Sequence, residues 1–252
     1  MSEEVLYERL TPPDFEARIK KAPIAYLPLG TLEWHGKHLP LGSDFLQSQG
    51  FFVKLAKRVG GIVLPPLFLG PDRIQKVDSR EYYGMDFSKH VPNPPQQLTG
   101  SAYWVPDKLF SEIIDAVLKQ LSRAGFKILV AHGHGPSTVY VLKHRKELSE
   151  KFGLAIFVLW GISDESKRDL EFQSDHAAAN ETSIMMALHP ELVHMENLPK
   201  DPEKWPLAVG GKDPRVYASP EHGKRIIQFN LERMEKILKK HLKLLRKQGL
   251  TK

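Results

Sequence analysis

Short, fully hydrophobic runs alternate along the chain with longer segments in which hydrophobic residues recur every three or four positions. The short runs are typical of buried strands and cover residues 24–29, 62–64, 127–131 and 154–160. The longer segments are typical of amphipathic helices and cover residues 45–58, 107–124, 137–151, 181–188 and 221–248. Strands that are hydrophobic throughout and alternate with helices predict an α/β fold with a mostly parallel central sheet covered on both faces.

The borders of these elements carry familiar signals. Asp44 precedes the helical segment 45–58 in the position of a helix cap, and Gly60-Gly61 ends that segment. Residues 70–104 are rich in proline, glycine and tyrosine and have no clear period, which predicts a long loop that acts as a lid or binding loop. Neither a linker nor a repeat interrupts the pattern, so we expect one domain over residues 1–252.

The composition is ordinary for a globular protein, with 41% hydrophobic and 26% charged residues. The absence of cysteine excludes disulfides, thiolate nucleophiles and zinc fingers. The chain has no signal pattern at its start and no hydrophobic run near the roughly 18 residues of a membrane helix, so we expect a cytoplasmic protein without a membrane partner. The net charge of +6 is densest in the last helix, which we interpret as a solvated face and not a nucleic-acid site.

Polar side chains that suit a metal ion follow two of the predicted strands. Glu33, His35 and Asp44 come after the strand 24–29, and His132 and His134 come after the strand 127–131. Ligands bind at the carboxyl ends of the strands in an open parallel sheet, so the two groups are expected to meet. Carboxylate oxygens and imidazole nitrogens together suit zinc, manganese, iron(II) or cobalt.

A third polar group, which follows the strand 154–160, is expected to close over the same place. It consists of Asp175, His176 and Glu181. Glu181 has a plainer interpretation as an acidic residue that favours the positive end of its own helix.

The remaining histidines have plainer interpretations. His38 is interpreted as a structural loop residue, whereas His132 is left open as a metal ligand, an orienter of a ligand or a hydrogen-bonding residue at the strand end. Five further histidines have no suitable neighbours in the sequence and are interpreted as unrelated to the site: His144, His189, His194, His222 and His241.

Residues 27–44 carry the motif that resembles a known family. They closely match PxGxxExHGxHLPLxxD, the signature of the creatininase family of metal hydrolases. Three further blocks follow in the order of that family. They are Gly133-His134, the segment from His176 through Glu181-Thr182-Ser183, and residues 218–224.

This resemblance implies a three-layer αβα fold, often assembled as a homohexamer, with a binuclear metal centre. Glu33, Asp44 and His134 would hold one ion, and His35 and Asp44 the other, so that Asp44 is the bridge. His176 would lie close to the substrate and assist proton transfer or orientation. The reactions of the family are hydrolyses of C–N bonds in cyclic or formyl amides and related compounds.

Two departures from the family pattern concern the second ion. Pro136 and Ala179 stand where creatininases or their relatives place a glutamate ligand. Either Glu181, His132 or water replaces that ligand, or the second ion binds weakly. We therefore expect one or two ions per chain, zinc or manganese, with iron as a further option.

The resulting hypothesis is a metal-dependent amidohydrolase that acts on a small polar amide through a metal-bound hydroxide. His176 or Glu181 would handle the proton of the leaving nitrogen, and His132, Asp175 and Trp160 would contact the substrate. Two alternatives stay open: a catalytically idle protein of the same fold that binds a metal or small molecule, and a hydrolase of lactones or cyclic ketones.

Overall fold

A four-stranded parallel sheet forms the centre of the molecule. The computed structural model describes residues 3–89, 91–159 and 175–250. Within them the strand order is β2-β1-β5-β6, and every neighbouring pair is parallel. The strands are β1 Ile24–Leu29, β2 Ile62–Val63, β5 Ile128–Gly133 and β6 Ala155–Val158. The predicted parallel sheet is confirmed.

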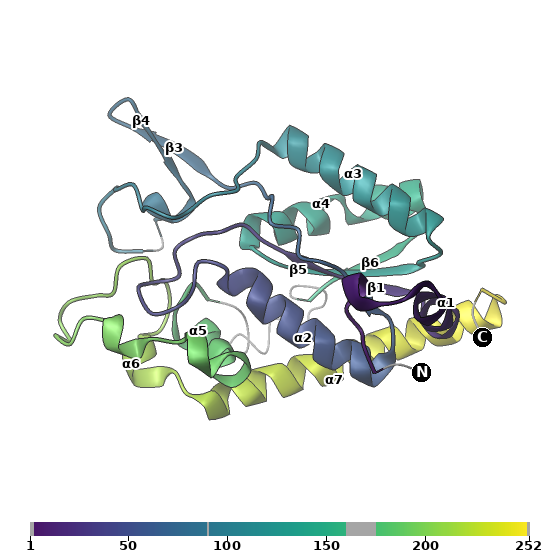
Figure 1. Cartoon of the computed structure of the whole chain (residues 1–252). Coiled ribbons are helices and arrows are strands. Elements are labelled where there is room, and N and C mark those ends of the chain that lie inside the picture. Colours follow the sequence, from purple (N-terminus) through teal and green to yellow (C-terminus); the bar gives the residue numbers. More distant parts are fainter. Residues whose placement is uncertain (1–2, 90, 160–174, 251–252) are drawn as a thin grey trace.

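Helices cover both faces of this sheet. They are α1 Pro12–Lys21, α2 Ser43–Val59, α3 Asp107–Arg123, α4 Gly135–Phe152, α5 Ala179–Leu188, α6 Pro214–Tyr217 and α7 Pro220–Lys247. Short 3-10 helices span Tyr7–Arg9, Gly84–Asp86, Pro190–Leu192 and Met195–Asn197. Figure 1 shows α3 and α4 on one side of the sheet and α2, α5 and α7 on the other. This is the three-layer arrangement predicted from the sequence.

The two faces of β1 explain why this strand is hydrophobic at every position. Ile24 and Tyr26 pack in the core that α2 and α7 close, whereas Ala25, Leu27 and Leu29 pack in the core that α3 and α4 close. All six residues of β1 are buried. Successive side chains of a strand point to opposite faces, so a strand between two helical layers needs hydrophobic residues on both.

The structure moves two predicted borders in the region of the polar residues. The strand predicted over 127–131 continues to Gly133, because Pro28 and Leu29 of β1 pair with His132 and Gly133. Helix α2 begins at Ser43 with Gly42 as its cap, so Asp44 is not the helix cap that the sequence suggested. The Ser43 backbone N–H and hydroxyl both donate to the carbonyl of Pro40, which starts the helix early and leaves the Asp44 carboxylate available for other contacts.

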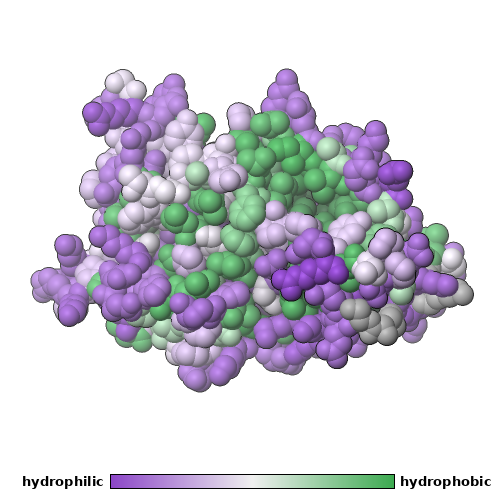
Figure 2. All heavy atoms as spheres, viewed as in Figure 1, coloured by the Kyte–Doolittle hydropathy of each residue, from purple (hydrophilic) through white to green (hydrophobic). Residues whose placement is uncertain are grey.

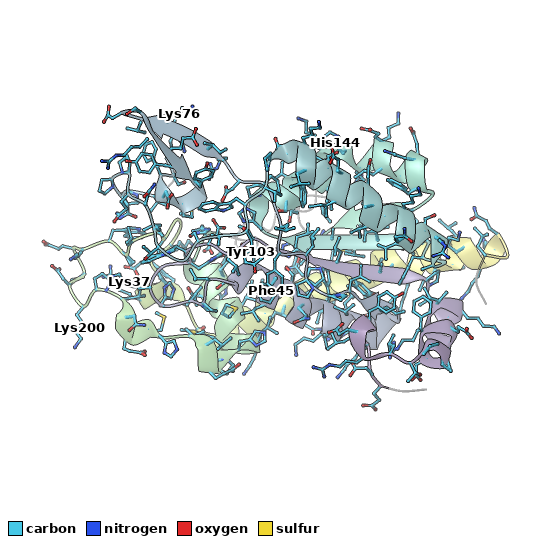
Figure 3. The ribbon with its side chains drawn as sticks, turned by 45° about the horizontal axis from the view of Figure 1, so that its top comes forward. Lys37, Phe45, Lys76, Tyr103, His144 and Lys200 are labelled. Atoms are coloured by element: carbon cyan, nitrogen blue, oxygen red, sulfur yellow. The ribbon has the colours of Figure 1, made fainter. Side chains whose placement is uncertain are left out.

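The segment predicted as a long loop contains a small hairpin. Strands β3 Ile74–Val77 and β4 Arg80–Tyr83 pair antiparallel, and the rings of Tyr83 and Trp104 stack 4.7 Å apart. Lys76 lies on the projecting hairpin, while Phe45 and Tyr103 lie near the middle of the molecule (Figure 3).

The N-terminal helix α1 was not predicted. Its signals were present, because the Thr11 hydroxyl accepts a hydrogen bond from the backbone N–H of Asp14 and Pro12 occupies the first position. Its hydrophobic residues are sparse, with Phe15 and Ile19 packed against the core that contains Phe126. The hydrophobic periodicity of this segment is therefore too weak to predict a helix.

The surface is mostly hydrophilic in the view of Figure 2, with a hydrophobic area on the side of α3. Leu109, on that helix, is 43% exposed. In the described part of the chain, none of the helices has the length and hydrophobicity needed to cross a membrane.

Candidate metal centre

Two regions that are distant in the sequence, residues 33–44 and His134, meet at the carboxyl ends of β1 and β5. The loop after β1 provides Glu33 and His35, the first turn of α2 provides Asp44, and the residue after β5 is His134. The backbone N–H of His134 donates to the carbonyl of Leu29, the last residue of β1. This pairing places His134 beside the loop that carries Glu33 and His35.

The first candidate ion position lies between Glu33, Asp44 and His134. The Nδ1 atom of His134 is 2.9 Å from Oε1 of Glu33 and 3.3 Å from Oδ2 of Asp44. All three residues are buried, and each offers one ligand atom within 4.8 Å of the others. The convergence predicted for these residues from the sequence is therefore present.

The second candidate position lies between His35, Asp44 and Glu181. The Nε2 atom of His35 is 3.5 Å from Oδ1 of Asp44 and 3.6 Å from Oε2 of Glu181. The carboxylate of Asp44 thus presents one oxygen to each group. Glu181 lies where the group needs a third donor, so the geometry favours Glu181 as the replacement for the glutamates absent at Pro136 and Ala179.

His132 does not belong to either group. Its Nδ1 atom is 2.8 Å from the hydroxyl of Ser48, on α2, and its side chain lies between the sheet and that helix. Burial lowers the pKa of His132 to about 3, so the ring is neutral. Of the interpretations left open for this histidine, the contacts favour a hydrogen-bonding residue at the end of β5.

Asp175 and His176 lie beside the second group. The carboxylate of Asp175 accepts hydrogen bonds from the backbone N–H groups of Asn180 and Glu181, which fixes the first turn of α5. The ring of His176 stacks on that of His35 with centroids 4.5 Å apart, and its Nε2 atom is 2.8 Å from the carbonyl oxygen of Trp34. Asp175 therefore positions Glu181, while His176 lines the cavity and forms a third group of possible metal donors with Glu33 and His35.

The electrostatics of the two groups favour a bound cation. Burial alone would lower the pKa of His35, but the carboxylates of Asp44 and Glu181 raise it to about 10. The pKa of His134 is likewise raised well above its usual value by Glu33 and Asp44, despite burial. Both imidazoles attract a proton because buried carboxylates surround them, and a metal ion satisfies the same demand.

Unpaired buried atoms show that the donor set fits a metal ion. Within the described residues, His35 Nε2 and Asp44 Oδ2 are buried and make no hydrogen bond. Buried polar atoms normally have a partner, and a cation between the two groups would satisfy both atoms. Two imidazoles with three carboxylates suit zinc or manganese.

A cavity of about 420 Å³ opens next to the two groups. Glu33, Asp44, His134, His176 and Glu181 all contribute to its wall. Its volume is in the range of small-molecule sites. The arrangement can hold a small polar substrate against both candidate ion positions.

Asp72 is a site residue that the sequence analysis did not identify. Its side chain is 2% exposed, and its Oδ2 atom is 3.7 Å from Nε2 of His134. Burial raises the pKa of Asp72 to about 6. The sequence gives no clear signal for Asp72, because it lies nine residues after the end of β2, in a segment without clear periodicity.

Trp160, predicted to contact the substrate, lies outside the described residues. The five histidines interpreted as unrelated to the site belong to none of the metal-binding groups of the described residues. One of them, His144, lies on the outer layer formed by α3 and α4 (Figure 3) and stacks on Tyr140.

His38 is a structural histidine, as interpreted from the sequence. Its Nε2 atom is 2.8 Å from the hydroxyl of Thr182 on α5, and its carbonyl accepts a hydrogen bond from the backbone N–H of His194. These contacts tie the loop after β1 to α5. Burial, together with nearby His35, lowers the pKa of His38 to about 4.

We expect His38 to make the protein sensitive to acid. The unfolded chain binds a proton at His38 near pH 6.5, whereas the folded chain binds it only near pH 4. The free energy of unfolding should therefore fall as the pH drops from about 6.5 to about 4, by about 3 kcal/mol in total from this residue. Urea unfolding between pH 7 and 4.5, with EDTA present, should show a flatter pH dependence for His38→Gln. The exposed His194→Gln variant should keep the wild-type slope, and parallel curves for all three proteins would contradict the assignment.

Comparison with known proteins identifies the family of this chain. The family model named Creatininase, described as creatinine amidohydrolase, matches residues 8–238. A creatinine amidohydrolase of Pseudomonas putida is 25% identical over 260 residues, covering 90% of this chain and 94% of the relative. A 3-dehydro-scyllo-inosose hydrolase of Thermotoga maritima is 24% identical over 247 residues, covering 86% and 73% respectively.

Solved structures share the fold. A crystal structure of creatinine amidohydrolase (creatininase) has a TM-score of 0.72 at 21% identity and covers 95% of this chain and 98% of its own. Two further creatininase structures, one described as Zn-Zn type and one as Mn, have TM-scores of 0.70 and 0.69 at 20% identity, and each covers at least 94% of this chain and 98% of its own. Because the family model spans most of the chain, the protein belongs to the creatininase family.

Proposed function

We propose that this member of the creatininase family opens the C–N bond of a small cyclic or formyl amide at a centre of two divalent ions. Membership of the family makes it a metal-dependent hydrolase. The observation that carries the finer proposal is the position of Asp44, whose two oxygens face separate groups of buried donors. A shared carboxylate is a common way to hold two ions close together.

We assign one ion to Glu33, Asp44 and His134 and the other to His35, Asp44 and Glu181. Zinc or manganese is the proposed metal, because the donors are imidazole and carboxylate and because solved creatininases are described with each of these metals. When bound, such ions polarise a carbonyl group and make water more acidic. Glu181 therefore serves as a ligand in this proposal, in addition to the proton role that the sequence suggested.

His176 is the proposed carrier of the proton. Its Nε2 atom is paired with the carbonyl oxygen of Trp34, which can only accept, so the ring hydrogen lies on Nε2 and Nδ1 can receive a proton. Burial and the neighbouring charge of His35 lower the pKa of His176. A neutral imidazole in the wall of the cavity can accept a proton from the attacking water and pass it to the leaving nitrogen.

The alternatives differ in what supports them. The hypothesis of a catalytically idle binding protein rested on the absence of glutamate at positions 136 and 179. The position of Glu181 beside His35 weakens this hypothesis. A hydrolase of lactones or cyclic ketones stays as the second candidate, since one relative is named for a substrate whose name denotes no amide.

Removing the metal should abolish the reaction. We expect EDTA treatment to lower hydrolysis about a hundredfold or more, and zinc or manganese to restore it, because bound ions would stabilise charge on the reacting carbonyl. Elemental analysis of the untreated protein should give about two ions per chain. Suitable probes are creatinine, hydantoin, an N-formyl amino acid, a δ-lactone and a cyclic diketone.

The results with these probes distinguish the proposed function from its two alternatives. Hydrolysis of the lactone or diketone alone would favour the second candidate. Two bound ions without turnover of any probe would favour the idle protein. Three further features stay predictions. They are a homo-oligomer (a hexamer by family resemblance), a cytoplasmic location and a single-domain organisation.

A further inference from the structure

Asp72 and His134 face each other with unpaired atoms. Asp72 Oδ2 and His134 Nε2 are 3.7 Å apart, and both side chains are 2% exposed. Neither atom makes a hydrogen bond within the described residues. An unpaired donor and an unpaired acceptor at this separation need only a small adjustment to form a hydrogen bond, which would satisfy both.

The hairpin holds the Asp72 carboxylate in this position. Its Oδ1 atom accepts a hydrogen bond of 2.7 Å from the backbone N–H of Arg73. The backbone N–H of Gly84, just after β4, donates to the carbonyl of Arg73. A Cβ on Gly84 would lie 2.1 Å from Asp72 Oδ2, so only a glycine allows the backbone to approach the carboxylate this closely. The hairpin therefore restricts the directions in which Asp72 can turn.

The two nitrogens of His134 then have different roles. Nδ1 faces the carboxylates of Glu33 and Asp44, so Nδ1 is the nitrogen that can bind the ion of the first group. Nε2 faces Asp72 and keeps its hydrogen. Metal-binding histidines commonly donate the second N–H to a carboxylate, which fixes the ring and strengthens the metal bond.

We propose that Asp72 is a positioning residue of the metal centre, which accepts the Nε2 hydrogen of His134 and thereby raises the affinity for the ion held by Glu33, Asp44 and His134. This inference rests on the proposed function and adds a residue outside both donor groups. It also makes metal binding depend on the position of the β3–β4 hairpin.

The test measures zinc affinity in place of turnover. Purified metal-free protein competes for Zn²⁺ with a chromophoric chelator, and the two binding steps are resolved by titration. Asp72→Ala should weaken one of the two steps by about 10- to 100-fold and leave the other within about twofold. Asp72→Asn, which retains one acceptor oxygen, should lie between Asp72→Ala and the wild type. The spectrum of the Co²⁺-substituted protein should change in the same order.

Glu81→Gln is the matched control on the same hairpin. Glu81 is exposed and pairs with Lys76 at 3.1 Å, so its loss should leave both zinc affinities unchanged. Thermal unfolding of the metal-free variants checks that each is folded. If Asp72→Ala is not folded, the zinc affinity of Asp72→Asn provides the test.

The outcomes separate this inference from the proposed function. Unchanged zinc affinities with a raised KM would overturn it and assign Asp72 to substrate contact. A wild-type chain that binds no zinc or manganese would overturn the proposed function itself. A wild-type chain that binds two ions tightly, with one weakened in both Asp72 variants, supports both.

Discussion

Replacing Asp44 by asparagine is expected to remove both metal ions and to lower kcat/KM by at least about a thousandfold. The carboxylate offers Oδ1 to the group of His35 and Oδ2 to the group of His134, so both ions depend on it. An asparagine has nearly the same shape but offers one neutral oxygen, and its amide nitrogen does not bind a cation. Two ions supply several kcal/mol of charge stabilisation in the transition state, which corresponds to a loss of this size.

His35→Gln should behave differently from Asp44→Asn. It removes a donor from the group of His35, Asp44 and Glu181 and leaves the group of Glu33, Asp44 and His134 intact. About one ion per chain should therefore remain, whereas Asp44→Asn should leave close to none. The control is Asp115→Asn, which replaces a carboxylate by an amide on the surface of α3, where Asp115 pairs with Lys151. Elemental analysis, circular dichroism and kcat/KM measure metal, folding and activity. Two ions in folded Asp44→Asn would contradict the bridging role.

The second large effect concerns the backbone beside the site. Gly133 has a φ of +150°, and a Cβ there would lie 1.8 Å from the carbonyl oxygen of Leu29. Gly133→Ala must therefore strain its own backbone and push β5 away from β1. We expect the free energy of unfolding, measured in urea, to fall by about 2 to 6 kcal/mol. Metal content should fall as well, because His134 follows directly.

Gly135→Ala is the matched control, two residues further along the chain. A Cβ at Gly135 meets nothing within 4 Å in the described structure, and the residue begins α4. This variant should be as stable as the wild type or slightly more stable, since alanine loses less conformational freedom than glycine in a helix. Equal unfolding free energies for the two variants would contradict the close approach of β5 to β1.

Much of the fold could be predicted because the signals are local. The strand 24–29 has the predicted limits, and the helix α3 ends within one residue of its prediction. Both depend on hydrophobic periodicity and on glycine or proline at the ends, which the sequence displays directly. The convergence of Glu33, Asp44 and His134 followed from a general rule about strand ends, so residues 33–44 and the distant His134 could be placed together from the sequence.

Other parts of the site depend on contacts that no local pattern records. The choice between Glu181, His132 and water as the replacement donor required knowing that α5 places Glu181 3.6 Å from His35. Asp72 lies in a segment without clear periodicity, and only the hairpin and Gly84 bring its carboxylate to His134. The start of α2 at Ser43 follows from a turn with Pro40, which left the two Asp44 oxygens free to face His35 and His134.

The sequence by itself determined the parallel sheet, the helices on both faces and the donors that follow β1 and β5, because hydrophobic burial imposes a period on residues close together in the chain. Only the tertiary structure decided that Glu181 lies beside His35, which atom of Asp44 faces which histidine and what stands opposite Nε2 of His134. Those relations are distances of a few ångströms between side chains that lie up to 146 positions apart, as for His35 and Glu181. Such distances are set by the packing of helices and loops on the sheet.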